Sequence, residues 1–136
     1  MYQSTGRLVM SNKTFEVGMV NPFDRSISKV DLSADKHGSI LGRAKQLMDC
    51  GTIDIVTLTE KHMAIVDDEG LLNEDNKYSK LADYHQPLAG IVLVMGYDAD
   101  GDNADIDPEY FEDLVKTTRF MNEGFSVEPR FEFVTL

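Results

Sequence analysis

Cysteine is nearly absent from this sequence, and tryptophan is absent altogether. The only cysteine is Cys50, so no disulfide can form within the chain and no cysteine pair is present to bind zinc or exchange thiols. We expect this thiol to pack as a small apolar side chain without chemistry. Because the aromatic residues are not interleaved with basic ones, a base-stacking surface for nucleic acid is disfavoured.

Long apolar runs are missing as well. The longest, residues 88–95, contains Ala89 and Gly90 and is far shorter than the roughly 20 apolar residues of a membrane-spanning helix. Residues 1–7 include polar side chains where a secretory signal would be apolar. We therefore predict no membrane contact and a cytoplasmic location, which agrees with the low cysteine content.

Basic residues are outnumbered, with 13 Lys and Arg against 24 Asp and Glu and a formal net charge of −11. Residues 67–113 hold fourteen of the carboxylates and only two lysines. Such a surface repels phosphate backbones and favours a cation or a basic protein surface as partner, although solubility alone would also explain the charge. The predicted interaction surface consists of Asp67, Asp68, Glu69, Asp98, Asp100, Asp102 and Asp105.

Several motifs of common enzymes are absent from the chain. It contains no G-x-S-x-G elbow, no phosphate-binding G-x-x-x-x-G-K-[ST] loop and no G-x-G-x-x-G fingerprint. His37, His62 and His85 are too far apart in sequence for a metal motif such as H-x-x-x-H, and we expect three separate surface or loop histidines. We assign no catalytic residue, and enzymes built on these motifs are disfavoured.

The segment that comes nearest to a ligand motif is the acidic stretch 98–109. Calcium requires several converging hard oxygens, and an EF-hand loop supplies them from Asp at positions 1, 3 and 5 and Glu at position 12. Those positions are occupied by Asp98, Asp100, Asp102 and Glu109. However, Asn103 replaces the glycine of the sixth position. We favour a solvated turn that leads into a helix and therefore predict no cofactor, with calcium as the alternative for this segment.

A second acidic turn, Asp67-Asp68-Glu69-Gly70, could hold magnesium or place two carboxylates for acid–base chemistry. Tight turns use the same residues for backbone reasons. Because no nucleophile or second motif accompanies this turn, a divalent-metal-dependent enzyme is the weakest of the functions considered.

Apolar and β-branched residues predict strands in much of the chain. Runs at 7–10 and 14–20 flank a short turn and predict a hairpin, and a further strand is expected at 27–32. Runs at 52–58 and 63–66 predict a second hairpin. The run at 88–97 lacks alternation, which is typical of a strand covered on both faces, and a last strand is expected at 130–134.

Two longer helices are predicted, with a third, short one between them. Apolar spacing at 40–48 indicates an amphipathic helix, for which Ser33 and Asp35 offer capping oxygens. Tyr78, Leu81 and Tyr84 have a spacing that favours a short helix.

The most strongly signalled helix follows Asp107-Pro108-Glu109, where a capping carboxylate precedes a first-turn proline. Its apolar stripe reaches Met121, and Gly124 is placed to end it. The order of elements predicts a single α+β domain, residues 1–136, with a mostly antiparallel sheet and two main helices.

The middle of the chain resembles a known family. The resemblance is carried by an apolar helix near Ile40, then Ile53-Asp54-Ile55-Val56, residues 64–72, the run 88–94 and an acidic turn up to Asp102. These features resemble the domain-of-unknown-function family DUF3846, short proteins common in bacteriophages and mobile elements. The segments before residue 30 and after Gly124 lie outside this resemblance.

The resemblance implies a phage or mobile-element accessory protein, acting in the cytoplasm of a bacterial host. Combined with the charge pattern, it leads us to expect a protein that binds a host protein through its acidic surface, for host takeover or evasion of host defence. The alternatives are a small-ligand-binding or sequestering protein and, less favoured, the metal-dependent enzyme. The sequence does not indicate an oligomeric state.

Overall fold

A six-stranded antiparallel sheet forms the centre of the protein, whose computed structural model describes residues 13–72 and 75–121. Five strands follow the order β2-β1-β7-β4-β3, and β8 pairs with β7 on the same side as β1. The strands are β1 (Thr14–Asn21), β2 (Ser26–Ser33), β3 (Ile53–Thr57), β4 (His62–Asp67), β7 (Val92–Tyr97) and β8 (Asn103–Ala104).

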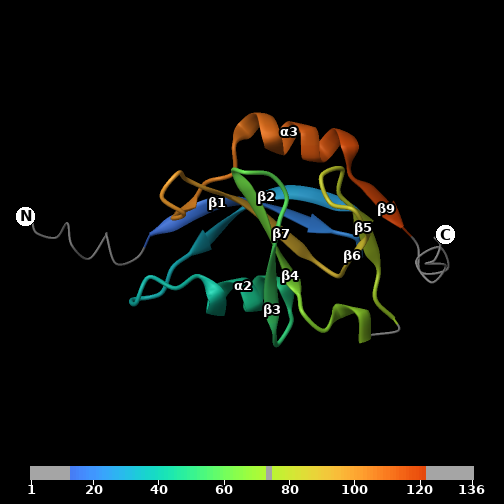
Figure 1. Ribbon diagram of the computed structural model, residues 1–136. Coiled ribbons are helices and arrows are strands. Elements are labelled where there is room, and N and C mark those ends of the chain that lie inside the picture. The colour runs from blue at the N-terminus through green and yellow to red at the C-terminus, as the bar shows by residue number, and fades with distance from the viewer. Residues whose placement is uncertain (1–12, 73–74, 122–136) are drawn as a thin grey trace, which may run out of the picture.

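Two helices cover opposite faces of this sheet, α2 (Leu41–Met48) below it and α3 (Pro108–Thr117) above it in Figure 1. Side chains of the central strand β7 therefore point alternately to the two faces. Leu93 and Met95 of β7 join the core under α2, whereas Val92 and Val94 join the core under α3. The prediction of a strand buried on both faces is therefore confirmed.

A second, three-stranded sheet lies beside the first and has the order β6-β5-β9. Its strands are β5 (Tyr78–Lys80), β6 (Leu88–Ala89) and β9 (Arg119–Met121), and a short 3₁₀ helix, η1 (Gly70–Leu72), precedes it. The helix predicted around Tyr78, Leu81 and Tyr84 is therefore wrong. The backbone of Tyr78 instead pairs with β6 and β9, because tertiary pairing outweighs a weak local pattern.

The predicted run 88–97 is divided between the two sheets. Gly90 has a φ of 77°, a left-handed conformation that glycine adopts without a steric penalty, and it turns the chain from β6 into β7. Strand β7 then pairs with β4 on one side and with β1 on the other, which makes it a central strand.

Of the two predicted hairpins, the second is confirmed, because β3 pairs with β4 from Ile53 opposite Asp67 to Thr57 opposite Met63. Strand β1 also forms a hairpin with β2, the further strand expected at 27–32, and residues 18–20 on its other edge pair with β7. The run 7–10 that was predicted to pair with β1 lies outside the described residues.

The helix boundaries agree only partly with prediction. Helix α2 begins after Ile40, whose side chain cannot cap it, and the N–H of Leu41 donates to the Ser39 hydroxyl. The Asp35 carboxylate, predicted as a cap, accepts the N–H groups of His37 and Ser39 in the preceding turn. These bonds lower the pKa of Asp35. Helix α3 begins as predicted, with the Asp107 carboxylate accepting the N–H of Glu109.

Helix α3 ends earlier than predicted, at Thr117, because the chain turns at Thr118 into β9. Met121, predicted as part of the helix stripe, pairs in a strand with Tyr78. The predicted strand 130–134 and Gly124 lie outside the described residues.

The fold class is nonetheless the predicted one, a compact α+β arrangement with two helices and antiparallel strands. Within residues 13–72 and 75–121, no helix is long and apolar enough to cross a membrane.

Candidate functional site

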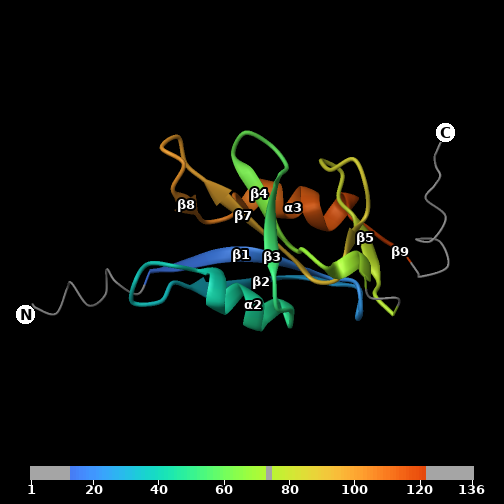
Figure 2. The same cartoon turned by 60° about the horizontal axis from the view of Figure 1, so that its bottom comes forward.

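The residues of the predicted acidic surface fall into two groups rather than one. Strands β4 and β7 are antiparallel, with His62 opposite Gly96 at one end of the pair. Asp67 ends β4 at the other end, whereas Asp98 follows β7 at the His62 end. In Figures 1 and 2 the orange turn after β7 and the lime-green segment after β4 lie at different sides of the molecule. A partner bound to one group would therefore not automatically contact the other.

The smaller group, Asp67, Asp68 and Glu69, lies in an ordinary turn after β4. The Asp67 carboxylate accepts the N–H of Glu69, and the N–H of Asp68 donates to the carbonyl of Thr52. Asp68 and Glu69 are exposed, and Asp67 is half-buried. These contacts are the ones that acidic residues make in a tight turn, which was the alternative to a magnesium or acid–base site in the sequence analysis.

The larger group begins in the turn between β7 and β8. The Asp98 carboxylate accepts the N–H groups of Asp100 and Asp102, and the N–H of Asp98 donates to the carbonyl of Asp102. Gly101, with a φ of 82°, completes the turn. The segment is thus the tip of a hairpin between two strands, whereas an EF-hand loop joins two helices.

The four residues with calcium spacing do not converge in the structure. Among the described residues, no group of three or more His, Cys, Asp or Glu side chains is arranged to hold a metal ion. Asp98 is engaged by turn amides, and Glu109 lies in the first turn of α3, beyond β8. Calcium binding by Asp98, Asp100, Asp102 and Glu109 stays a prediction.

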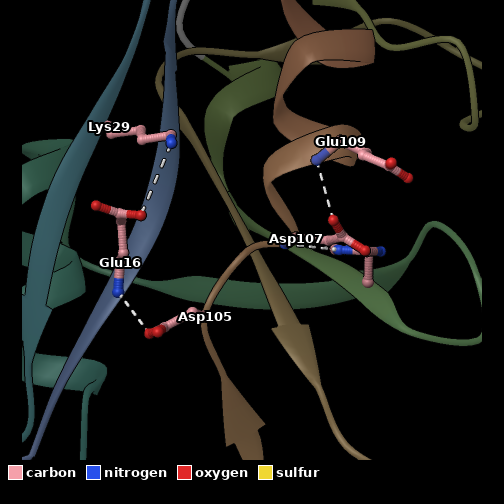
Figure 3. A network of polar contacts seen from close by, with 6 residues as sticks. Glu16, Lys29, Asp105, Asp107 and Glu109 are labelled. Atoms are coloured by element: carbon pink, nitrogen blue, oxygen red, sulfur yellow. Dashed lines mark hydrogen bonds and ion pairs between the residues drawn. The ribbon is translucent and has the colours of Figure 1, made fainter.

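Two further aspartates fix the chain between the turn and α3 (Figure 3). The Asp105 carboxylate accepts the N–H of Glu16 on β1 at 2.9 Å, while the Glu16 carboxylate lies 3.8 Å from the ammonium of Lys29. The Asp107 carboxylate caps α3 through the N–H of Glu109, also at 2.9 Å. Asp105, predicted as part of the interaction surface, therefore also holds the backbone in place, and Asp107 caps the helix as predicted.

We call residues 98–113 the acidic segment. It contains eight carboxylates and no Lys, Arg or His. All eight side chains are exposed, and in the described part of the chain none of them forms an ion pair. The eight residues are Asp98, Asp100, Asp102, Asp105, Asp107, Glu109, Glu112 and Asp113.

The sequence analysis missed a cluster of contacts that surrounds His62. This residue was expected at the surface, but it is only 6% exposed, so that prediction is wrong. Its ring stacks on Tyr110 of α3, with centroids 3.9 Å apart and planes 9° from parallel. Its Nε2 accepts the N–H of Asp107 at 3.3 Å, and its Nδ1 lies 3.4 Å from the Thr59 hydroxyl.

This arrangement requires neutral His62, because a ring nitrogen that accepts a hydrogen bond cannot carry a proton. Burial lowers the pKa of His62, and the nearby carboxylates of Asp107 and Asp83 oppose that shift. Only the apolar neighbours on β4 hinted that this position was buried, and no local pattern paired it with a helix 45 residues later.

Tyr110 extends the cluster to a loop after β5. Its hydroxyl donates to the Asp83 carboxylate at 2.8 Å, and burial together with this bond raises the pKa of Tyr110. A cleft of about 300 Å³ opens here between α3 and the loop. It is lined by Ala82, Asp83, Tyr110, Asp113, Leu114 and Thr117.

Cys50 lies apart from these features and is partly buried. Burial raises the pKa of its thiol, which leaves less of the reactive thiolate at neutral pH.

Comparison with known proteins places this arrangement in a family. The model of a domain of unknown function, DUF3846, matches residues 16–119, which include all the described strands except the first two residues of β1 and the last two of β9. The chain belongs to the DUF3846 family. The match begins well before residue 30, so DUF3846 includes the β1–β2 hairpin that the sequence resemblance left out. No curated protein and no solved structure matches the chain.

Proposed function

We propose that this DUF3846 member is a non-enzymatic accessory protein of a phage or mobile element, which binds a host protein with a basic surface through the acidic segment. Host takeover or evasion of host defence, in the host cytoplasm, is the purpose that such binding would serve. The observation that carries the proposal is the exposure of all eight carboxylates of residues 98–113, with no ion pair to any of them in the described part of the chain.

A segment whose charges all have one sign attracts an oppositely charged partner before the two proteins touch, and this attraction raises the association rate. Complementary charge raises association rates from roughly 10⁵–10⁶ to as much as about 10⁸–10⁹ M⁻¹s⁻¹ at low salt, and salt screens the effect over about 8 Å at physiological ionic strength. Binding through the acidic segment should therefore weaken as salt rises.

The segment also has a defined backbone. Asp98 closes the turn, Asp105 is bonded to β1 and Asp107 caps α3. The remaining carboxylates are left for a partner. Holding them on fixed backbone lowers the entropy lost on binding.

The test compares two variants that lose the same charge. The segment variant carries Asp100→Asn, Asp102→Asn, Glu109→Gln and Glu112→Gln, whose side chains are exposed and accept no hydrogen bond from the described part of the chain. The control variant carries Asp31→Asn, Asp49→Asn, Asp68→Asn and Glu69→Gln at exposed positions elsewhere. Capture from bacterial host lysate at low and high salt identifies a partner, and surface plasmon resonance with the purified partner gives its rates.

We expect the wild type and the control variant to bind the same host protein at low salt and to lose it at high salt. The segment variant should associate at least about tenfold more slowly. Equal binding by the segment variant, or affinity that does not change with salt, would contradict the proposal.

A second candidate function, small-ligand binding or sequestering, is favoured by the cleft beside Tyr110. Its volume of about 300 Å³ is at the lower end of the range of about 300–1,000 Å³ for ligand sites. Native mass spectrometry of the gently purified protein tests it, because a bound molecule would add its mass to the intact chain.

A further inference from the structure

The cleft beside Tyr110 combines three features that the proposed function does not use. It is a hollow between two segments, its wall contains an aromatic ring, and two carboxylates line it. We propose that it receives the guanidinium group of an arginine side chain of the partner protein. This inference rests on the proposed function, since it names the group of the partner that the protein binds most specifically.

The carboxylates are arranged as acceptors for a cation. One oxygen of Asp83 accepts the Tyr110 hydroxyl, and its other oxygen accepts no hydrogen bond from residues 13–72 and 75–121. Asp113, one turn along α3 from Tyr110, also lines the cleft, and its carboxylate accepts no bond from the described residues. Guanidinium groups form pairs of charge-assisted hydrogen bonds with carboxylates.

The tyrosine ring is held rigidly for a planar group. His62 covers one face of the ring at a centroid distance of 3.9 Å, and Asp83 fixes the hydroxyl. Because one face is covered, Tyr110 lines the cleft with its other face and its edge. A guanidinium stacks on aromatic faces and is less strongly hydrated than an ammonium, which favours arginine over lysine here.

Lys80, at the end of β5, is already engaged. The Lys80 ammonium donates to the carbonyls of Leu81 and Tyr84, at the base of the loop that carries Asp83. It therefore stabilises the loop from within. Among the described residues this ammonium forms no ion pair with Asp83 or Asp113. Burial lowers the pKa of Lys80, although Asp83 is near enough to oppose that shift. The size of the cleft suits one side chain better than a larger molecule.

The probe is the blocked tripeptide acetyl-Gly-Arg-Gly-amide, titrated into ¹⁵N-labelled protein and followed by NMR. Its matched control replaces arginine with citrulline, which has nearly the same shape and no charge. We expect saturable shifts at Asp83, Tyr110, Asp113 and Thr117 with the arginine peptide, weaker ones with a lysine peptide and none with citrulline.

Two single variants complete the test. Asp113→Asn should raise the dissociation constant of the arginine peptide roughly tenfold, because it removes a charged acceptor. Asp31→Asn, the same charge change at an exposed position of β2 outside the acidic segment, should leave it unchanged. Equal shifts from the citrulline peptide, or unchanged affinity in Asp113→Asn, would overturn the inference.

The outcomes separate this inference from the proposed function. A host partner lost in the segment variant but bound equally by Asp113→Asn would uphold the proposed function and reject arginine binding in the cleft. Specific arginine binding in the cleft without any salt-sensitive host partner would uphold the cleft and reject the host-protein function.

Discussion

At the scale of single residues, His62 connects strand β4 to the start of α3, the helix that lies within the acidic segment. It stacks on Tyr110, accepts the N–H of Asp107 and approaches Thr59. The bond from Asp107 forms only while Nε2 of His62 is unprotonated. A buried histidine of this kind makes the stability of the protein depend on pH near neutrality.

We expect stability to fall as the pH drops. The folded pKa of His62 is lowered by burial, so the unfolded chain binds more protons below its own pKa of about 6.5. The contribution of His62 is therefore fully present above about pH 6.5 and is lost as the pH falls through the folded pKa. Urea unfolding between about pH 7.5 and about pH 5.5 measures it. His62→Gln should flatten this dependence, and the exposed His85→Gln should not. An unchanged slope in His62→Gln would contradict the assignment.

Gly96 is a second residue whose importance depends on close approach. A Cβ at this position would lie 2.5 Å from the backbone carbonyl oxygen of Asp105, where the chain crosses β7. We expect Gly96→Ala to destabilise the protein by about 1–3 kcal/mol, since backbone has to move. Gly42→Ala in α2 is the control, because its Cβ would meet nothing within 4 Å. It should stabilise by up to about 1 kcal/mol, and equal effects in urea unfolding would contradict this account.

At the scale of elements, the β7–β8 hairpin and α3 form one continuous acidic unit. The hairpin tip is set by Asp98, the connection by the bond from Glu16 to Asp105, and the helix start by Asp107. The buried side of α3 packs closely on β1, where a Cβ on Gly18 would lie 3.3 Å from Leu114. The charges of the unit are thus presented from elements that are fixed to the core.

The helix start gives a direct prediction. Asp107→Ala should cost about 1 kcal/mol of unfolding free energy, because the N–H of Glu109 loses its acceptor. Asp107→Asn keeps an acceptor oxygen and should cost less. Chemical denaturation of both variants checks this, and equal losses would assign the effect to charge rather than to capping.

The hairpin tip gives a prediction about calcium. Because Asp98 already accepts two turn amides and no cluster of ligands forms in the described residues, we expect a dissociation constant no tighter than about 10⁻⁴–10⁻³ M. Isothermal titration of the wild type and of Asp100→Asn measures it. Micromolar affinity that is lost in Asp100→Asn would establish the EF-hand-like site that the spacing suggested.

At the scale of the whole molecule, charge is distributed very unevenly. The formal net charge is −11, and eight negative charges belong to the sixteen residues of the acidic segment. Repulsion within such a distribution destabilises the compact state, and salt reduces it.

We therefore expect the melting temperature to rise between about 0.01 M and about 1 M sodium chloride, over which the screening length falls from about 30 Å to about 3 Å. The segment variant should show a smaller rise than the control variant, although both lose four charges. Differential scanning fluorimetry measures both. The same salt response in the two variants would show that repulsion is spread over the molecule rather than concentrated in residues 98–113.

The sequence determined the features that depend on near neighbours along the chain. The cap at Asp107, the β3–β4 hairpin and the buried strand β7 follow from local patterns, and all three are present. The acidic charge of residues 98–113 was also evident, because it is a matter of composition.

Only the tertiary structure decided what depends on contacts between distant segments. It separated Asp67 from Asp98, because antiparallel pairing sends the ends of β4 and β7 in opposite directions. It turned Tyr78 into a strand residue and buried His62 against α3, because β9 and Asp107 approach them from more than 40 residues away. Local patterns carry no information about such partners, since burial and backbone pairing over that distance are fixed only when the whole core has packed.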